Sequence, residues 1–161
     1  MKHYKKEIEK DLDAALGKPK YYIDAPVMEE GERYEWFPTL GESMTDGTPK
    51  SIPSGSLVLG RWLKFNSIHD VPLHRPIVVI LNIDGEQFCV LKSACKIHSS
   101  PADASDEVCL RSYNPASRCD DLWVPFHYIK FIFVVEIVRR PDGHEFIPKQ
   151  EEVTRKSGKA K

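Results

Sequence analysis

The feature that most restricts the fold of this chain is a series of short apolar runs, separated by turn signals, that begins at residue 34. The runs are rich in β-branched and aromatic residues, which is typical of strands. Asp84-Gly85, Asn114-Pro115 and Pro141-Asp142-Gly143 are typical of turns. The pattern predicts strands at residues 34–40, 57–63, 76–83, 87–92, 107–112 and 131–139, with a polar loop at residues 99–106.

Ahead of these runs, one short helix is expected at residues 3–16, because apolar residues recur at every fourth position from Tyr4 to Leu16. Such a helix either packs on the body or on a partner, or is a frayed end. A chain of 161 residues can form one domain with its own core. Many short strands with little helix predict a mainly β fold, with a curled or barrel-like sheet. We expect a helical arm and linker at residues 1–33, a β domain at 34–148 and a basic tail at 149–161.

The charge of the chain argues against nucleic acid as a partner. The formal net charge is −1, and one helix is too few for a helix-turn-helix motif, so no specific DNA binding is expected. No apolar run is long enough to cross a membrane, and no apolar segment follows the charged N-terminal residues as it would in a signal peptide. These features predict a cytoplasmic protein without a membrane partner.

The cysteines and histidines do not show the spacing of a metal site. The four cysteines, Cys89, Cys95, Cys109 and Cys119, form no Cys-x-x-Cys pair. In a cytoplasmic protein they are expected to be reduced thiols. The six histidines show no metal-ligand spacing either. The sequence therefore predicts no metal and no cofactor.

The first candidate for chemistry is Gly41-Glu42-Ser43-Met44, which follows the apolar run at residues 36–40. A small residue ahead of a serine lets the backbone turn tightly and leaves the hydroxyl exposed at a strand end. The peptide N–H groups of Gly41, Glu42 and Ser43 would then face a developing oxyanion. An ordinary surface turn would have the same sequence, so the motif alone leaves both interpretations open.

The second candidate is Lys92, at the end of the predicted strand at residues 87–92. Lys92 follows Phe88 and Val90 at period two and should share their face of the sheet. If that face is buried, desolvation lowers the pKa of the lysine, and the neutral amine can take a proton from a serine hydroxyl. The alternative is a lysine near a strand end with its ammonium group in water.

Four short segments resemble, in their order, the motifs of the LexA-like serine peptidases: Gly41-Glu42-Ser43-Met44, Ile52-Pro53-Ser54-Gly55-Ser56-Leu57-Val58, Val90-Leu91-Lys92 and Leu110-Arg111-Ser112-Tyr113-Asn114-Pro115. That family includes the C-terminal domains of LexA and of phage repressors, and the mutagenesis protein UmuD. The resemblance covers residues 34 to 140 and does not include the helix-turn-helix domain that precedes the peptidase domain in the repressors.

The resemblance implies a serine endopeptidase with a Ser-Lys dyad. Ser43 would be the nucleophile and Lys92 the general base, Met44 would support the serine, and the backbone of residues 41–43 would bind the oxyanion. The substrate would be a protein or peptide, and the role would lie in a stress response such as the SOS response, or in transcription regulation. The alternative is a non-catalytic dimeric module that binds a protein partner, as the processed form of UmuD does.

Two further expectations follow from the same comparison of residues. The run at 131–138 is apolar on both faces, which predicts a homodimer through C-terminal strands or else a central strand buried on both sides.

Members of the family that cut themselves do so upstream of the serine, between a small residue and glycine. Here Gly17 and Gly31 follow Leu16 and Glu30, so no self-cleavage is expected.

Overall fold

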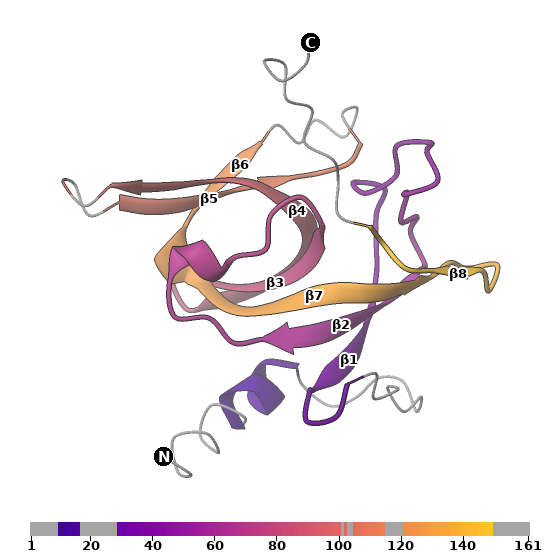
Figure 1. Ribbon diagram of the computed structural model, residues 1–161, viewed down its shortest axis with the longest axis horizontal. Helices are drawn as coiled ribbons and strands as arrows, with labels where there is room; N and C mark the ends of the chain where they lie inside the picture. The colour runs from indigo at the N-terminus through magenta and orange to yellow at the C-terminus, as the bar shows by residue number, and fades with distance from the viewer. Residues whose placement is uncertain (1–9, 17–28, 101, 103–104, 115–120, 150–161) are drawn as a thin grey trace.

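The computed structural model describes residues 10–16, 29–100, 102, 105–114 and 121–149, which form a mainly β protein with a short helix at residues 10–16 (Figure 1). Within these described ranges, two single 3-10 turns, η1 (Ile68–Asp70) and η3 (Phe126–Tyr128), interrupt the β structure. The strands are β1 (Tyr34–Pro38), β2 (Leu57–Leu63), β3 (Pro76–Ile83), β4 (Glu86–Ser100), β5 (Ser105–Arg111), β6 (Leu122–Pro125), β7 (Ile129–Arg139) and β8 (Glu145–Phe146).

The strands form one antiparallel sheet with the order β1-β2-β7-β3-β4-β5-β6, and β8 pairs with β7. The long strand β4 bends strongly, so it pairs with β3 along its first half and with β5 along its second half (Figure 1). Within the described residues β1 and β6 each have a strand on one side only, so the sheet is curled but open. The predicted mainly β, curled fold is confirmed, and the sheet does not close into a barrel.

The predicted strands agree best with the strands of the structure where the sequence is apolar. The runs at 57–63 and 76–83 are strands over their full predicted lengths. The polar loop predicted at residues 99–106 is wrong at both ends, because β4 continues to Ser100 and β5 begins at Ser105. Ser99 Oγ donates to Asp106 Oδ1 across this hairpin (2.8 Å), so polar cross-strand contacts replace burial there. Most of the predicted basic tail lies outside the described residues.

Two clusters of buried side chains lie on the two faces of the sheet, and β7 contributes to both. Phe133 and Val135 pack in the cluster with the helix, β1 and β2, whereas Ile129 and Ile132 pack in the cluster with η1 and β5. We call these the helix-side core and the β5-side core. Both faces of β7 are thus covered within one chain, which agrees with the interpretation of the run at 131–138 as a central strand. The apolar character of β7 therefore gives no ground for a homodimer.

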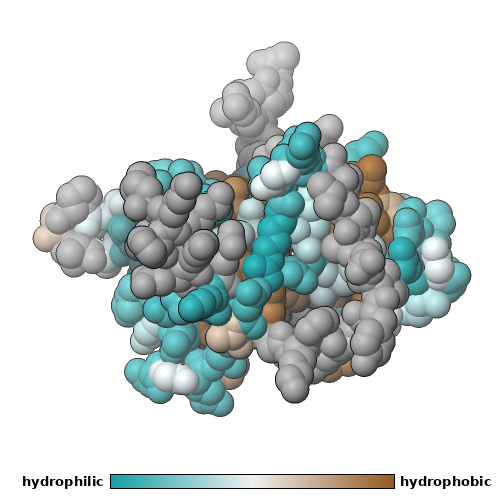
Figure 2. All heavy atoms as spheres, turned by 90° about the horizontal axis from the view of Figure 1, so that it is seen from below, coloured by the Kyte–Doolittle hydropathy of each residue, from teal (hydrophilic) through white to brown (hydrophobic). Residues whose placement is uncertain are grey.

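The helix at residues 10–16 packs on the body. Leu12 is fully buried in the helix-side core, and Leu16 packs against the same cluster. Gln87 Nε2 donates to the Ala15 carbonyl (2.8 Å), and Arg33 pairs with Asp13 (2.5 Å). The N-terminal part of the predicted helix lies outside the described residues. Among the coloured residues of the face shown in Figure 2, most are hydrophilic, and apolar side chains are visible in small patches.

Phe133→Ala should lower the free energy of unfolding by about 3–5 kcal/mol, because it removes a large buried ring and leaves a cavity. Phe133 is fully buried and makes an edge-to-face contact with Phe37, with ring centroids 4.8 Å apart. The control is Ile147→Ala, since Ile147 is 65% exposed and its change should stay within about 0.5 kcal/mol. Urea denaturation followed by circular dichroism measures both, and equal effects would contradict this description of the core.

Candidate active site

Ser43 lies in a tight turn shortly after β1. Gly41 has a φ angle of 85°, in the left-handed region that favours glycine, which redirects the chain as it leaves the strand. The Thr45 N–H then donates to the Glu42 carbonyl (3.0 Å) and closes a β-turn with Ser43 at its second position. The half-buried Ser43 side chain lines a cleft of the molecule.

Contacts with the core, with Ile52 and with Asn114 hold this turn in place. Met44 is 2% exposed in the helix-side core, and its carbonyl accepts a hydrogen bond from the Ile52 N–H (2.8 Å). The Asn114 N–H donates to the Ser43 carbonyl (2.9 Å), and Asn114 Nδ2 donates to the Glu42 carbonyl (3.1 Å). The backbone on each side of the serine is therefore fixed by contacts that are distant in the sequence.

Lys92 reaches Ser43 from β4. Lys92 Nζ donates to Ser43 Oγ (3.1 Å) and to Ser112 Oγ (2.8 Å). Ser93 pairs with Arg111 in the β4–β5 ladder, so the next position along places Lys92 opposite Ser112. The structure thus brings together the two side chains that the sequence predicts as nucleophile and base. Lys92 is half-buried, whereas Ser112 is 8% exposed.

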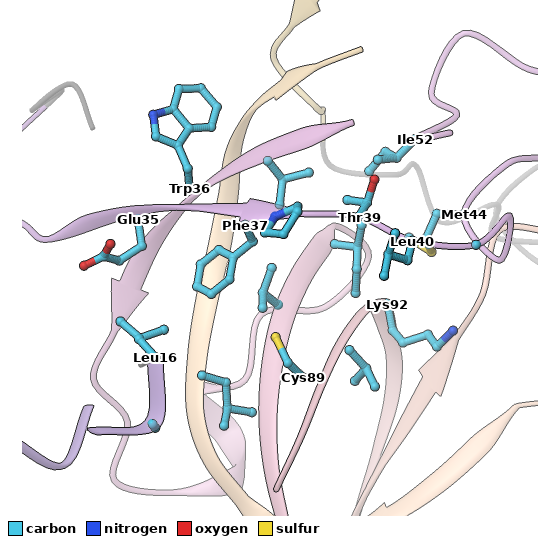
Figure 3. Close-up of a pocket in the computed structure, with 18 of the residues that line it drawn as sticks. Leu16, Glu35, Trp36, Phe37, Thr39, Leu40, Met44, Ile52, Cys89 and Lys92 are labelled. Atoms are coloured by element: carbon cyan, nitrogen blue, oxygen red, sulfur yellow. The ribbon is translucent and has the colours of Figure 1, made fainter. Parts of the chain in front are cut away.

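A cleft of about 810 Å³ leads to this group of side chains. Its lining includes Phe37 and Pro38 of β1, Val78 and Ile80 of β3, and Gln87 and residues 89–92 of β4. Figure 3 shows Lys92 at the end of the cleft near Leu40 and Met44, with Leu16 of the helix at the opposite end.

Two strand edges border the cleft. Among the residues that the structure describes, β1 pairs only with β2, and residues 86–92 of β4 pair only with β3, because the pairing of β4 with β5 begins at Ser93. Within the described residues, each segment therefore has a row of backbone N–H and C=O groups on the side away from its partner strand. Such edges can accept an added extended chain.

The predicted oxyanion groups differ in their present contacts. The Gly41 N–H already donates to Ser54 Oγ (3.0 Å), so it is engaged in this state. Among the hydrogen bonds between described residues, none uses the Ser43 N–H. Of these two groups, the Ser43 N–H is therefore the available donor, whereas the Gly41 N–H would first have to exchange its partner.

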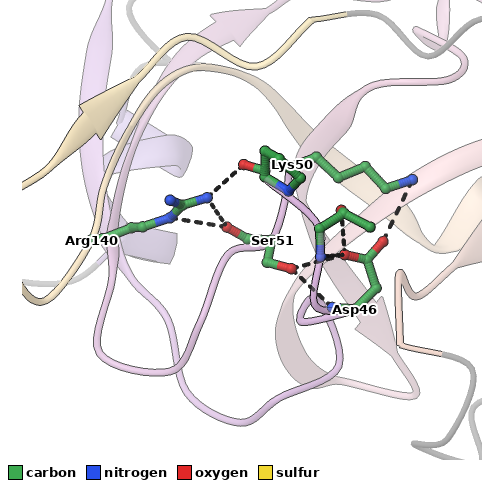
Figure 4. Close-up of polar contacts among 6 residues, drawn as sticks. Asp46, Lys50, Ser51 and Arg140 are labelled. Carbon is green, nitrogen blue, oxygen red and sulfur yellow. Dashed lines mark hydrogen bonds and ion pairs between the residues drawn. The ribbon is translucent and has the colours of Figure 1, made fainter.

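The loop that follows Ser43 is organised around Asp46 (Figure 4). Asp46 Oδ1 accepts hydrogen bonds from the Thr48 N–H (3.0 Å) and from Ser51 Oγ (2.8 Å), and Lys50 Nζ lies 3.7 Å from Oδ2. Arg140, beyond the end of β7, donates to the carbonyl groups of Pro49 and Ser51. Burial by itself raises the pKa of the Asp46 carboxyl group, but the hydrogen bonds and the charge of Lys50 hold that pKa below its usual value of 3.8.

Ser112 and Asn114 are functional candidates that the sequence reasoning assigned no role. Both belong to Leu110-Arg111-Ser112-Tyr113-Asn114-Pro115, the fourth segment of the resemblance, which was the available signal. Their roles depend on strand pairing that places this segment beside Lys92 and beside the Ser43 turn. Met44, for which the resemblance implies a supporting role, is buried in the helix-side core next to Ser43.

Comparison with protein-family models, with curated proteins and with solved structures finds no match for the chain. The family relationship therefore remains a proposal that depends on the motifs and on the geometry above. Among the described residues, no helix is long and apolar enough to cross a membrane.

Asp46→Asn should lower the free energy of unfolding at neutral pH by about 1 kcal/mol, since it weakens hydrogen bonds to a charged acceptor. The pKa of Asp46 is lower in the folded state than its ordinary value of 3.8, so its contribution is present above that pH and is lost as the pH falls through the folded-state pKa. The difference between the two proteins should therefore shrink in strong acid.

Urea denaturation at neutral pH and below the ordinary pKa of aspartate measures this dependence. The matched control is Asp84→Asn, at an exposed turn, which should change the free energy of unfolding by less than about 0.5 kcal/mol. A difference between wild type and Asp46→Asn that stays constant with pH would show that the carboxylate charge does not hold this loop.

Proposed function

We propose that the chain is a LexA-like serine endopeptidase in which Ser43 is the nucleophile and Lys92 the general base. The observation that carries the proposal is the hydrogen bond of 3.1 Å between Lys92 Nζ and Ser43 Oγ at one end of an apolar cleft. Two residues from separate sequence motifs meet within the reach that general base catalysis needs. The proposal also includes the link to a stress response or to transcription regulation that the resemblance implies.

The reaction follows from this contact. Neutral Lys92 accepts the hydroxyl proton while Ser43 Oγ forms a bond to the carbonyl carbon of the substrate, and the carbonyl oxygen becomes an oxyanion beside the Ser43 N–H. The Lys92 ammonium then protonates the amide nitrogen, the C–N bond breaks and the amine leaves. Water, deprotonated by Lys92, hydrolyses the ester, and the proton returns to Ser43.

Ser112 is a positioning residue in this scheme. Its hydroxyl oxygen accepts a hydrogen bond from Lys92 Nζ (2.8 Å), which restrains the long lysine side chain at the distance that Ser43 requires. Ser112 is buried, so its hydroxyl needs a hydrogen-bond partner, and Lys92 provides one. The β4–β5 pairing brings Lys92 to Ser112, and the turn at Ser43 brings the nucleophile to the same lysine.

The substrate that fits the cleft is an extended peptide. The edge of β1 and the edge of residues 86–92 of β4 can each pair with its backbone, as in recognition by strand addition. The lining formed by Phe37, Val78 and Ile80 would receive apolar side chains. The helix at residues 10–16 lines the end of the cleft away from Lys92 and limits how far a substrate extends in that direction.

A second candidate function is a non-catalytic module, dimeric like UmuD, that holds a protein partner in the same cleft. The size and apolar lining of the cleft favour it, because they suit the binding of a peptide whether or not the peptide is cut. The two candidates differ only in whether Ser43 forms a covalent bond to the bound chain.

Ser43→Ala and Lys92→Ala should each lower peptide cleavage by roughly 10²–10⁴-fold, because each removes a group that takes part in the transition state. The assay is incubation with a peptide library and identification of cut bonds by mass spectrometry. The rate should rise with pH, since Lys92 acts as a base only in its neutral form. Ser99→Ala and Lys130→Ala, both at exposed positions, are the matched controls and should cleave like wild type.

Two results would contradict the peptidase and leave the binding module. One is the absence of any cleavage between neutral and mildly alkaline pH. The other is cleavage that survives in both Ser43→Ala and Lys92→Ala, which would come from a contaminating enzyme.

The purified chain should remain intact over days at alkaline pH. Glu30-Gly31 would bring a carboxylate into the site beside Lys92, at a desolvation cost of several kcal/mol, and its charge would keep the lysine protonated. Leu16-Gly17 begins within the helix, where Leu16 packs on the helix-side core. Mass spectrometry follows the chain length, and a discrete N-terminal truncation in wild type that is absent from Ser43→Ala and Lys92→Ala would overturn this prediction.

A further inference from the structure

A second group of reactive side chains lies in the β4–β5 region, outside the cleft. Cys95 of β4, Cys109 of β5 and Asp121, directly before β6, each present a ligand atom, and these atoms lie within 4.8 Å of one another. Cys95 is 8% exposed and Cys109 is fully buried, whereas Asp121 is exposed. The three side chains therefore converge from three segments, with the carboxylate on the solvent side.

An irregularity in β4 produces this convergence. The register of the β4–β5 pair shifts between Ala94 and Lys96, and Lys96 pairs with Cys109. Ala94 and Ile97 both contact the β5-side core although they are three positions apart, so the bulge adds one residue between them. Cys95 and Lys96 consequently both lie on the opposite face, beside Cys109. Cys95 Sγ contacts the Cys109 carbonyl oxygen at 3.6 Å.

The carboxylate of this group is held by an arginine. Arg111 Nε donates to Asp121 Oδ1 (2.8 Å), and Arg111 Nη2 donates to Asp121 Oδ2 (2.7 Å). The hydrogen bonds from Arg111 hold the pKa of the Asp121 carboxyl group below its usual value of 3.8, so the group is ionised at neutral pH. Burial and the neighbouring Cys95 raise the pKa of the Cys109 thiol to about 12.

We propose that Cys95, Cys109 and Asp121 form a binding site for a thiophilic divalent cation, and that Zn²⁺ is the ion whose chemistry fits it best. Two sulfur ligands and one carboxylate suit Zn²⁺, whereas Mg²⁺ and Ca²⁺ require oxygen ligands. Three protein ligands leave the fourth tetrahedral position to water, on the exposed side where Asp121 lies. The proposal departs from the expectation of no metal site, which considered only the spacing of ligands along the sequence.

The charges of the site balance when the ion is bound. Zn²⁺ replaces the protons of both thiols, and two protons go to solvent. Two thiolates, one carboxylate and Zn²⁺ give a net charge of −1, which the guanidinium of Arg111 offsets. Arg111 would remain the outer partner of the carboxylate, a type of contact that orients metal ligands. Because protons compete with the ion, binding should weaken as the pH falls.

The position of the site links it to the contact between Lys92 and Ser112. Cys95 follows Lys92 on β4, and Cys109 lies on β5 shortly before Ser112, which directly follows that strand, so an ion bound to both cysteines joins β4 and β5 just beyond the Lys92–Ser112 contact. The third ligand ties the start of β6 to the same point. The metal would thus stabilise this corner of the sheet, and its binding does not depend on peptidase activity.

Cobalt titration tests the site in a Cys89→Ser/Cys119→Ser background, which keeps the two proposed thiols and removes the others. The protein is reduced with a phosphine and freed of metal with a chelator. One equivalent of Co²⁺ should produce thiolate charge-transfer absorption and the visible bands of a tetrahedral ion. Zn²⁺ should displace the cobalt and raise the melting temperature, whereas Mg²⁺ should do neither.

Variants in the same background assign the ligands. Cys95→Ser and Cys109→Ser should each weaken cobalt binding by at least about 100-fold, and Arg111→Gln, an outer partner, by about tenfold. Asp121→Asn should weaken cobalt binding by a factor between these two. Asp106→Asn on β5 is the matched control and should bind cobalt as tightly as the background protein. Circular dichroism of the metal-free variants establishes that each one is folded.

Several outcomes would overturn the proposal. One is the absence of charge-transfer absorption at stoichiometric cobalt. Another is charge-transfer absorption that persists in both cysteine variants. A third is an affinity for cobalt that is unchanged in Asp121→Asn. If a cysteine variant does not fold, alkylation of the reduced background protein replaces it. Zn²⁺ should then protect two thiols from the reagent, and equal labelling with and without Zn²⁺ would contradict the site.

Discussion

The arrangement around Ser43 depends on the antiparallel pairing of β4 with β5. That pairing sets Ser93 against Arg111, so Lys92 lies opposite Ser112 and its amine has a fixed partner in a buried position. A lysine side chain has many rotamers, and restraining it costs conformational entropy unless hydrogen bonds offset the loss. The contact with Ser112 supplies one such bond, and the contact with Ser43 depends on the orientation that it maintains.

Ser43 itself is not part of the sheet, so its position must come from the loop that carries it. Met44 inserts into the helix-side core, and Asn114 binds the backbone on both sides of the serine position. Asn114 belongs to the same segment as Ser112, so one stretch of chain holds both the nucleophile turn and the lysine. Arg140, from the end of β7, fixes the far part of the loop. The site is therefore assembled by contacts among segments that are far apart in the sequence.

The sequence predicts the parts of this structure that depend on local pattern. The runs at 57–63 and 76–83 have the predicted bounds because they are apolar strands in the middle of the sheet. The sequence did not predict β6, because this strand is short. Its residues Leu122 and Trp123 are exposed, so the strand lacks the alternation of apolar and polar residues that marks a half-buried strand. The motifs suggested Ser43 and Lys92 as a pair.

Other features require the pairing register, which no local pattern contains. The role of Ser112 follows only from the residue that it opposes on β4. The meeting of Cys95 with Cys109 requires a bulge, and a one-residue shift in register would turn either side chain to the other face. Spacing along the sequence therefore predicted no metal site, although the fold brings three ligand atoms together.

The most direct test of the account is a double-mutant cycle on the free energy of unfolding, with Lys92→Met, Ser112→Ala and the double variant. If Lys92 Nζ and Ser112 Oγ are hydrogen-bonded within the folded chain, the two changes should be coupled by about 0.5–1.5 kcal/mol. Urea denaturation of the four proteins at one pH gives this value without any assumption about the substrate. Strictly additive effects would contradict the contact that places the lysine beside Ser43.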